Sequence, residues 1–124
     1  MIAAGIPPDY IESPRMRLHC YRRLAMFTSE NDLDAFASEL RDRFGPVPAE
    51  ADHLLLTCRI RLAAAAAGIT NVTCRDNLVY LEKNRQMLRH DGLIPAILAS
   101  AKPAQKLKLV LRTVREFIPR AEQN

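Results

Sequence analysis

Apolar residues recur every three or four positions along the first half of the chain, which is the spacing of amphipathic helices. The pattern predicts three helices, over residues 15–28, 30–44 and 48–67. The second helix has the clearest limits, because Ser29 stands where an N-cap is expected and Gly45 is followed by Pro46, which prevents continuation. We therefore expect a helical N-terminal half.

Residues 1–14 precede these helices and hold three of the eight prolines of the chain. Proline fixes its own φ and pushes the residue before it toward extended backbone. The sequence therefore predicts an extended N-terminal arm over residues 1–14.

Beyond Gly68 the apolar period changes from 3.6 to two, which predicts a β region over about residues 70–98. Asp76 and Asn77 tolerate left-handed backbone, so we expect a tight hairpin around them. A third strand is expected over residues 86–89. Residues 93–100 fit a strand and a short helix equally well.

Pro103 opens a last predicted helix, over residues 103–118. The order is then three helices, a small antiparallel sheet and a helix. Because the helices and strands are segregated along the chain, the sequence predicts the α+β class. A length of 124 residues suits one hydrophobic core, so we expect a single domain over residues 1–124.

Composition and cysteine content exclude some classes of protein. Apolar residues make up 48% of the chain and charged residues 26%, and no apolar run is long enough to cross a membrane. The three cysteines are odd in number and form no Cys-x-x-Cys pair, which is typical of reduced thiols in the cytoplasm. We expect a cytoplasmic domain without a membrane partner.

The sequence contains no catalytic or cofactor-binding motif. Its three histidines are isolated, and neither a glycine-rich phosphate loop nor a Gly-x-Ser-x-Gly turn occurs. We therefore predict no enzymatic activity, no cofactor and no metal site. An enzyme would need a pocket lined by titratable groups, and no pattern in the sequence indicates one.

Basic residues give a modest excess of positive charge, 18 Lys and Arg against 14 Asp and Glu. Several of them fall on the last predicted helix, including Arg112 and Arg115. Either these are solvated outer faces of amphipathic helices, or they contact phosphates. A basic nucleic-acid-binding accessory domain, with Arg112 and Arg115 as its contacts, is therefore the alternative function.

An acidic pair stands out near the end of the second predicted helix. Glu39 and Asp42 are three residues apart and project near one another, with Arg43 one turn from Glu39. Negative charge near a helix C-terminus is mildly unfavourable for the helix dipole. Either the pair is ordinary surface charge around a helix end, or it serves an outside partner, of which a locally unfavourable choice is a hint.

Several motifs in a fixed order carry a family resemblance. They are Ile6-Pro7-x-Asp9-Tyr10-Ile11, Arg17-Leu18-x-x-Tyr21-Arg22-Arg23-Leu24-Ala25, Glu39-Leu40-x-Asp42-Arg43-Phe44-Gly45-x-x-Pro48 and Ala67-Gly68-Ile69. Over about residues 6–70 the chain resembles the C-terminal domain of bacterial transcription-repair coupling factors. It departs from the family at Arg41, where an apolar residue is usual.

The resemblance implies a non-catalytic regulatory domain. In the family this domain packs on the UvrB-like N-terminal module of the same protein and covers the surface that recruits UvrA. It acts as an autoinhibitory clamp until the motor engages stalled RNA polymerase. Carried over by motif position, Glu39 and Asp42, beside Arg43, would face a basic surface of that module. ATP-driven movement on DNA would belong to other parts of the parent protein.

Overall fold

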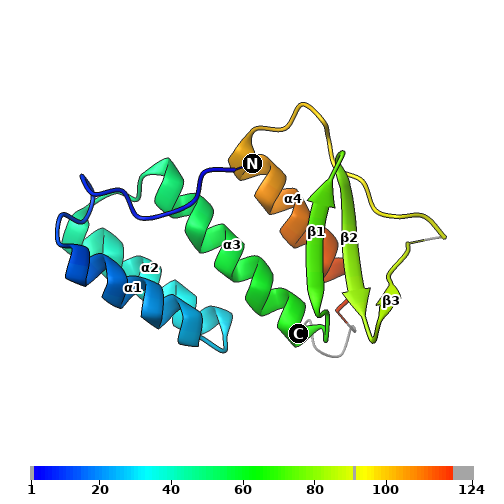
Figure 1. Cartoon of the computed structure of the whole chain (residues 1–124), viewed down its shortest axis with the longest axis horizontal. Helices are drawn as coiled ribbons and strands as arrows, with labels where there is room; N and C mark the ends of the chain where they lie inside the picture. Colours follow the sequence, from blue (N-terminus) through cyan, green and yellow to red (C-terminus); the bar gives the residue numbers. More distant parts are fainter. Residues whose placement is uncertain (1, 91, 119–124) are drawn as a thin grey trace. The chain divides into compact units, whose positions relative to one another are not determined.

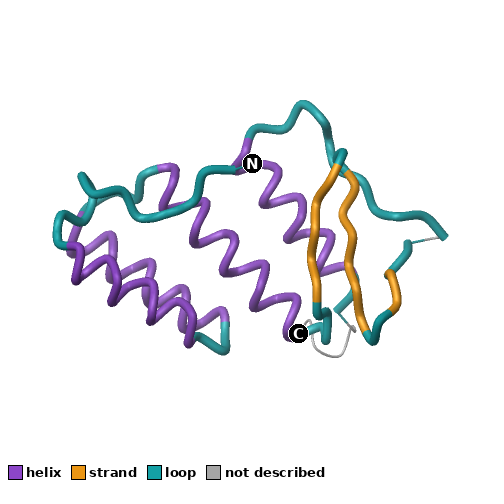
Figure 2. The backbone as a smooth tube through the Cα atoms, viewed as in Figure 1, coloured by secondary structure: helices purple, strands orange, loops and turns teal. Residues whose placement is uncertain are grey.

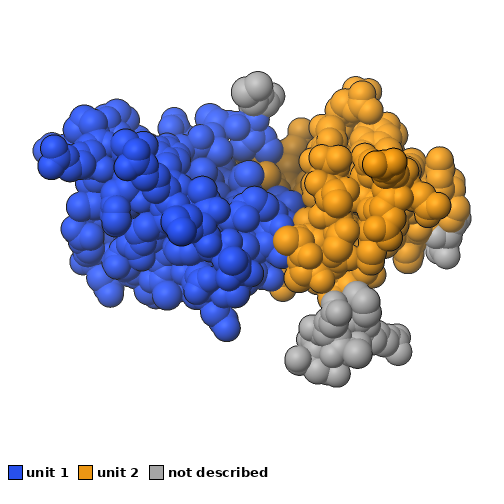
Figure 3. All heavy atoms as spheres, turned by 60° about the horizontal axis from the view of Figure 1, so that its bottom comes forward, with its two compact units in different colours: residues 1–62 blue, residues 63–124 orange. Residues whose placement is uncertain are grey.

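The computed structural model of the chain describes residues 2–90 and 92–118. In this part of the chain, four helices and a three-stranded antiparallel sheet follow one another in the order α1–α2–α3–β1–β2–β3–α4 (Figures 1 and 2). The predicted α+β class is confirmed. Contacts group the chain into two compact units, residues 1–62 and 63–124 (Figure 3). The single domain expected from the sequence stays a prediction.

The sequence predicts an extended arm over residues 1–14, and this is wrong at residues 7–11, which form a turn. The backbone N–H groups of Tyr10 and Ile11 donate to the carbonyl of Pro7 at 3.0 and 3.2 Å, which closes a turn. Pro8 favours this turn because its fixed φ suits the second position. The arm also packs into the core of the first unit, where Ile6 and Ile11 are buried.

Helix α1 (Pro14–Met26) begins inside the predicted arm and ends two residues before its predicted limit. Pro14 stands in the first turn, where its missing N–H costs no hydrogen bond. The hydroxyl of Ser13 accepts a hydrogen bond from the N–H of Met16 at 3.2 Å and caps the helix. This cap was not recognised in the sequence.

Helix α2 (Glu30–Phe44) has the limits that the sequence predicts. The hydroxyl of Ser29 accepts from the N–H of Asp32 at 3.2 Å, and Gly45 follows the last turn with φ of 89°. Its N–H donates to the carbonyl of Arg41 at 3.0 Å. An L side chain is strained at such a φ, so glycine allows the helix to end here.

Helix α3 (Ala49–Ala66) ends in a Schellman motif. The N–H of Ile69 donates to the carbonyl of Ala64 at 2.8 Å, and that of Gly68 to Ala65 at 3.0 Å. Gly68 has φ of 75° and Ile69 is buried. A glycine at positive φ followed by a buried apolar residue is the usual composition of such a helix end.

The core of the first unit lies between the arm and the three helices. Leu33 and Phe36 of α2 are almost fully buried, with 0% and 1% of their surface exposed. The other buried members of this core come from the arm, α1, α2 and α3: Ile6, Ile11, Cys20, Leu24, Ala37, Leu40, Leu55, Cys58 and Leu62. One face of α2 is thus fixed by packing, while its other faces carry the charged residues.

The second unit contains the sheet, formed by β1 (Asn71–Arg75), β2 (Leu78–Lys83) and β3 (Gln86–Met87) in the order β1-β2-β3. Asp76 and Asn77 have φ of 50° and 62°, as the predicted hairpin requires. The two strands pair from Arg75 with Leu78 to Asn71 with Glu82. The third strand is shorter than predicted, two residues in place of residues 86–89.

Residues 93–98 form neither the strand nor the helix that the sequence left open. Their backbone lies beside β2 without forming a regular element, and Ala96 makes a single antiparallel bridge with Leu78. Pro95 explains this, because it has no N–H to donate to a ladder or to a helix. The carbonyl of Pro95 instead accepts from the N–H of Val79 at 2.8 Å.

Helix α4 (Pro103–Glu116) packs against β2 and ends two residues before its predicted limit. Val110 and Val114 are buried on α4, as are Val79 and Leu81 on β2. Alternate residues of β2 therefore form the inner face of the sheet. No helix in the described part of the chain is long and apolar enough to cross a membrane.

Candidate functional site

The C-terminal end of α2 is held by Tyr10 of the arm. The Tyr10 hydroxyl donates to the carbonyls of Gly45 and Leu40, at 2.8 and 3.2 Å. Its ring lies 5.9 Å from that of Phe44, at an interplanar angle of 58°. Burial raises the pKa of Tyr10, so the hydroxyl keeps the proton that it donates. Two motifs thirty residues apart in the sequence thus meet at one place.

Glu39 lies on α2 and its carboxylate is paired with Arg23 of α1. The Arg23 guanidinium donates to Oε2 of Glu39, and the two side chains are 33% and 40% exposed. The same guanidinium lies 4.9 Å from the centroid of the Phe36 ring. Glu39 therefore reaches solvent, and Arg23 pairs with it above the core.

Asp42 is the freer of the two carboxylates. It follows Glu39 by three positions on α2, so both side chains project from the same side of the helix. Asp42 is exposed, and no hydrogen bond or ion pair of its side chain is found among the described residues. An incoming cation could pair with Asp42 without displacing another group.

Arg43 is exposed beside this pair and borders a small hollow. Its guanidinium lies 5.1 Å from the centroid of the Phe44 ring. Arg43 and Phe44 line an open pocket of about 340 Å³ together with Tyr10, Ile11 and Met16 of the arm and α1. Arg43, next to Asp42 in the chain, therefore borders a shallow and mostly apolar hollow.

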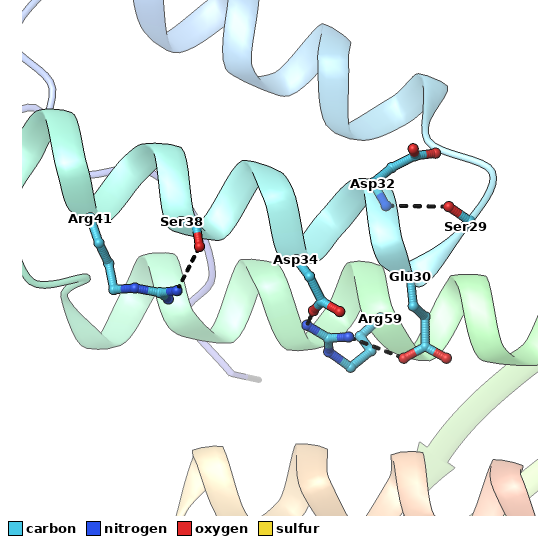
Figure 4. A network of polar contacts seen from close by, with 7 residues as sticks. All are labelled: Ser29, Glu30, Asp32, Asp34, Ser38, Arg41 and Arg59. Atoms are coloured by element: carbon cyan, nitrogen blue, oxygen red, sulfur yellow. Dashed lines mark hydrogen bonds and ion pairs between the residues drawn. The ribbon is translucent and has the colours of Figure 1, made fainter.

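A second polar network fixes α2 on α3 (Figure 4). Arg59 of α3 lies between Glu30 and Asp34 of α2, at 3.1 and 2.6 Å from their carboxylate oxygens. Burial lowers the pKa of Arg59, but its hydrogen bonds to Asp34 and Glu30 outweigh this effect and raise it. Arg59 therefore stays charged and braces the helix that carries Glu39 and Asp42.

The sequence singled out the acidic residues but missed the side chains that position them. Arg23 and Tyr10 belong to motifs quoted for the resemblance, but nothing in the sequence distinguishes Arg23 from Arg22 beside it as the partner of Glu39. Arg59 gave no signal beyond its charge. In the described part of the chain, no cluster of three or more His, Cys, Asp or Glu could hold a metal ion.

The basic residues of the alternative function lie on α4, in the second unit. Arg112 has a side chain that is 77% exposed, and its Nε lies 3.8 Å from Oε1 of Glu116, one turn away. Arg115 is also exposed. Nucleic-acid binding through these two residues stays a prediction.

A comparison with known protein families shows to which family the chain belongs. The family described as the TRCF domain matches residues 1–90. The chain belongs to the TRCF domain family. The resemblance inferred from the motifs is confirmed, and the match of this TRCF domain extends beyond the residues 6–70 that carried it.

Curated relatives of this TRCF domain are named transcription-repair-coupling factor. The protein of Escherichia coli strain K12 is 30% identical over 136 residues, which cover 96% of this chain and 12% of that protein. The protein of Mycobacterium bovis is 46% identical over 72 residues, covering 58% of this chain and 6% of that protein. The TRCF domain thus spans about an eighth of the length of these relatives, or less.

A solved structure supports the fold. It is described as the crystal structure of the C-terminal domain of transcription-repair coupling factor, and it matches this TRCF domain with a TM-score of 0.74 at 16% sequence identity. The superposition covers 95% of this chain and 90% of the solved one. The α+β arrangement described above is therefore that of a known domain.

Proposed function

We propose that this TRCF domain is a non-catalytic regulatory domain of a transcription-repair coupling factor, acting in transcription-coupled DNA repair in the cytoplasm. It packs on the UvrB-like N-terminal module of the same protein and covers the surface that recruits UvrA. In this role it is an autoinhibitory clamp. The observation that supports the proposal most directly is the exposed carboxylate of Asp42, one turn from Glu39 on α2.

The arrangement of charges suits an interface that must open again. Among the described residues the carboxylate of Asp42 has no partner, and Arg23 is paired with Oε2 of Glu39, so Oε1 can accept from a second cation. Charged pairs of this kind give registration and specificity more than affinity. A clamp released by a conformational change needs an interface of moderate strength, which polar contacts provide.

The helix that presents these carboxylates is rigidly held. Tyr10 fastens its C-terminal end, Arg59 braces its first turns, and Phe36 anchors its middle in the core. A rigid presentation lowers the entropy lost when the two surfaces meet. The partner surface on the UvrB-like module is therefore expected to be basic, with cations spaced to match one helical turn.

RNA polymerase and UvrA are indirect partners in this proposal. DNA is engaged through the motor of the parent protein, which this chain does not include. The domain alone is expected to hydrolyse no ATP. Its contribution is to keep UvrA away from the UvrB-like module until the motor engages stalled polymerase.

Competition with UvrA tests the proposal. The UvrB-like module of the parent protein is labelled with a fluorophore and titrated with UvrA, with and without saturating amounts of the TRCF domain. We expect the TRCF domain to weaken UvrA binding in proportion to its own occupancy of the module. A ternary complex, with UvrA affinity unchanged, would contradict the clamp.

A further inference from the structure

A second surface, in the second unit, carries the features of a protein-docking groove. Residues 93–98 and α4 line the two sides of an open groove of about 660 Å³. Its walls are mostly apolar and include Ile94, Ile97 and Leu109. Leu93 and Leu98, at its border, are 72% and 62% exposed. Large apolar side chains left in water beside a groove mark a surface that a partner covers.

The groove is preformed. The backbone of residues 93–98 is fixed to the hairpin by hydrogen bonds from Val79 to Pro95 and from Ile97 to Asn77, both of 2.8 Å. On the α4 wall the hydroxyl of Thr113 donates to the carbonyl of Leu109 at 2.8 Å, so it is not left unsatisfied when a partner excludes water. A partner therefore meets an apolar surface that needs little rearrangement.

Charge specifies what kind of partner fits. Residues 63–124 contain ten Lys and Arg against five Asp and Glu, a net charge of +5, whereas residues 1–62 contain eight against nine, a net charge of −1. Arg112 and Glu116 line the groove, and Lys108 precedes Arg112 by one turn on the exposed face of α4. The pair of Arg112 with Glu116 is long and solvated, so it exchanges readily.

We propose that this groove binds an acidic amphipathic segment of a partner protein. Apolar side chains of the segment enter between residues 93–98 and α4, and its carboxylates face Arg112 and Lys108. The exposed leucines argue against a nucleic-acid backbone as the occupant, because phosphates and sugars offer little apolar surface to cover Leu93 and Leu98. This binding is independent of the proposed clamp, which uses the first unit.

The test uses the whole 124-residue chain and a synthetic probe. The probe is a fluorescent helical peptide of about 16 residues, roughly four turns, with leucines at helical spacing and glutamates elsewhere. Its twin has lysine in place of every glutamate. We expect the acidic probe to bind, to shift the NMR signals of residues 93–98 and α4, and to lose about tenfold in affinity in Leu98→Ser and in Arg112→Glu.

Control variants and a second probe distinguish an acidic segment from the other possible occupants of the groove, which are a basic segment, a second copy of the chain and DNA. Met26→Ser, which changes an 80% exposed methionine of the first unit, is expected to bind the acidic probe like the unchanged chain. Arg112→Glu is expected to gain affinity for the lysine twin. Equal binding of both probes, or NMR shifts outside the groove, would overturn the proposal. So would Leu98-dependent self-association without a probe, or displacement of the probe by duplex DNA whose own binding is unaffected by Leu98→Ser.

Discussion

Arg23 of α1 is paired with Glu39 of α2, and its guanidinium lies over the ring of Phe36. One side chain thereby joins a carboxylate on the surface to an aromatic residue of the core, across two helices. The contact gives Glu39 a partner within the chain, while Asp42 one turn later stays without a partner among the described residues. The two carboxylates of the proposed interface thus differ in availability.

Arg23→Ala is expected to lower the free energy of unfolding by about 1 kcal/mol, since it removes a partly exposed ion pair and a cation–π contact. A double-mutant cycle with Glu39→Ala should give a coupling of about 0.5 kcal/mol by urea denaturation. The neighbouring exposed residue provides the control, because Arg22→Ala should change stability by less than about 0.5 kcal/mol. Zero coupling would mean that the pair contributes nothing in solution.

Tyr10→Phe removes the hydroxyl that donates to Gly45 and Leu40 but keeps the ring beside Phe44. We expect a loss of about 1 to 2 kcal/mol in unfolding free energy, because the end of α2 then lacks its donor. Tyr80→Phe is the matched control, since no hydrogen bond of the Tyr80 hydroxyl is found among the described residues. Equal effects of the two variants would contradict the role of Tyr10.

Leu81→Ala tests the core of the second unit. Leu81 is fully buried on β2, so its truncation is expected to cost about 2 to 5 kcal/mol. Leu93→Ala, at a residue that is 72% exposed, should change stability by less than about 0.5 kcal/mol. Thermal unfolding of both variants measures the difference. A large loss in Leu93→Ala would show that Leu93 is part of the core and not of a docking surface.

The thiols are expected to differ in reactivity. Burial raises the pKa of Cys20, whereas Cys74 is exposed on β1. Alkylation near pH 8, followed by peptide mass spectrometry, should therefore modify Cys74 well before Cys20, because the thiolate is the reactive form. Faster modification of Cys20 would show that α1 opens readily in solution.

The raised pKa of Cys20 makes the free energy of unfolding depend on pH. Cys20 in the folded chain keeps its proton at a pH where the unfolded chain has lost it. The stability present below the ordinary thiol pKa of about 8.5 is therefore lost as the pH rises through the raised folded value. Replacing Cys20 by alanine should flatten this decline, which urea denaturation at a series of pH values measures.

Local signals in the sequence were sufficient for α2. A side chain that caps three residues ahead, a stripe of apolar residues and a glycine at positive φ all act within one or two turns, so Ser29 and Gly45 set its limits without help from the rest of the chain. The Asp76–Asn77 hairpin was predictable for the same reason. Asn84 and Arg85 also have positive φ, although arginine there gives no turn signal.

Contacts between elements were not predictable. Arg23 lies sixteen residues before Glu39, and Arg59 lies twenty-five residues after Asp34, so only the packing of the helices brings each pair together. Residues 93–98 were ambiguous because apolar side chains favour a buried element while Pro95 prevents a regular one. Their irregular path beside β2 depends on which hairpin groups remained to accept and donate hydrogen bonds.

The most direct test of the central claim is the affinity of the UvrB-like module for charge-reversed variants of this domain, measured by isothermal titration at low salt. Glu39→Lys/Asp42→Lys is expected to weaken binding by about tenfold or more, because two carboxylates would become cations opposite a basic surface. Glu50→Lys, at an exposed carboxylate of α3, is the control and should bind within about twofold of the unchanged domain. If the double variant, folded by circular dichroism, binds as tightly as this control, the acidic pair on α2 does not form the interface.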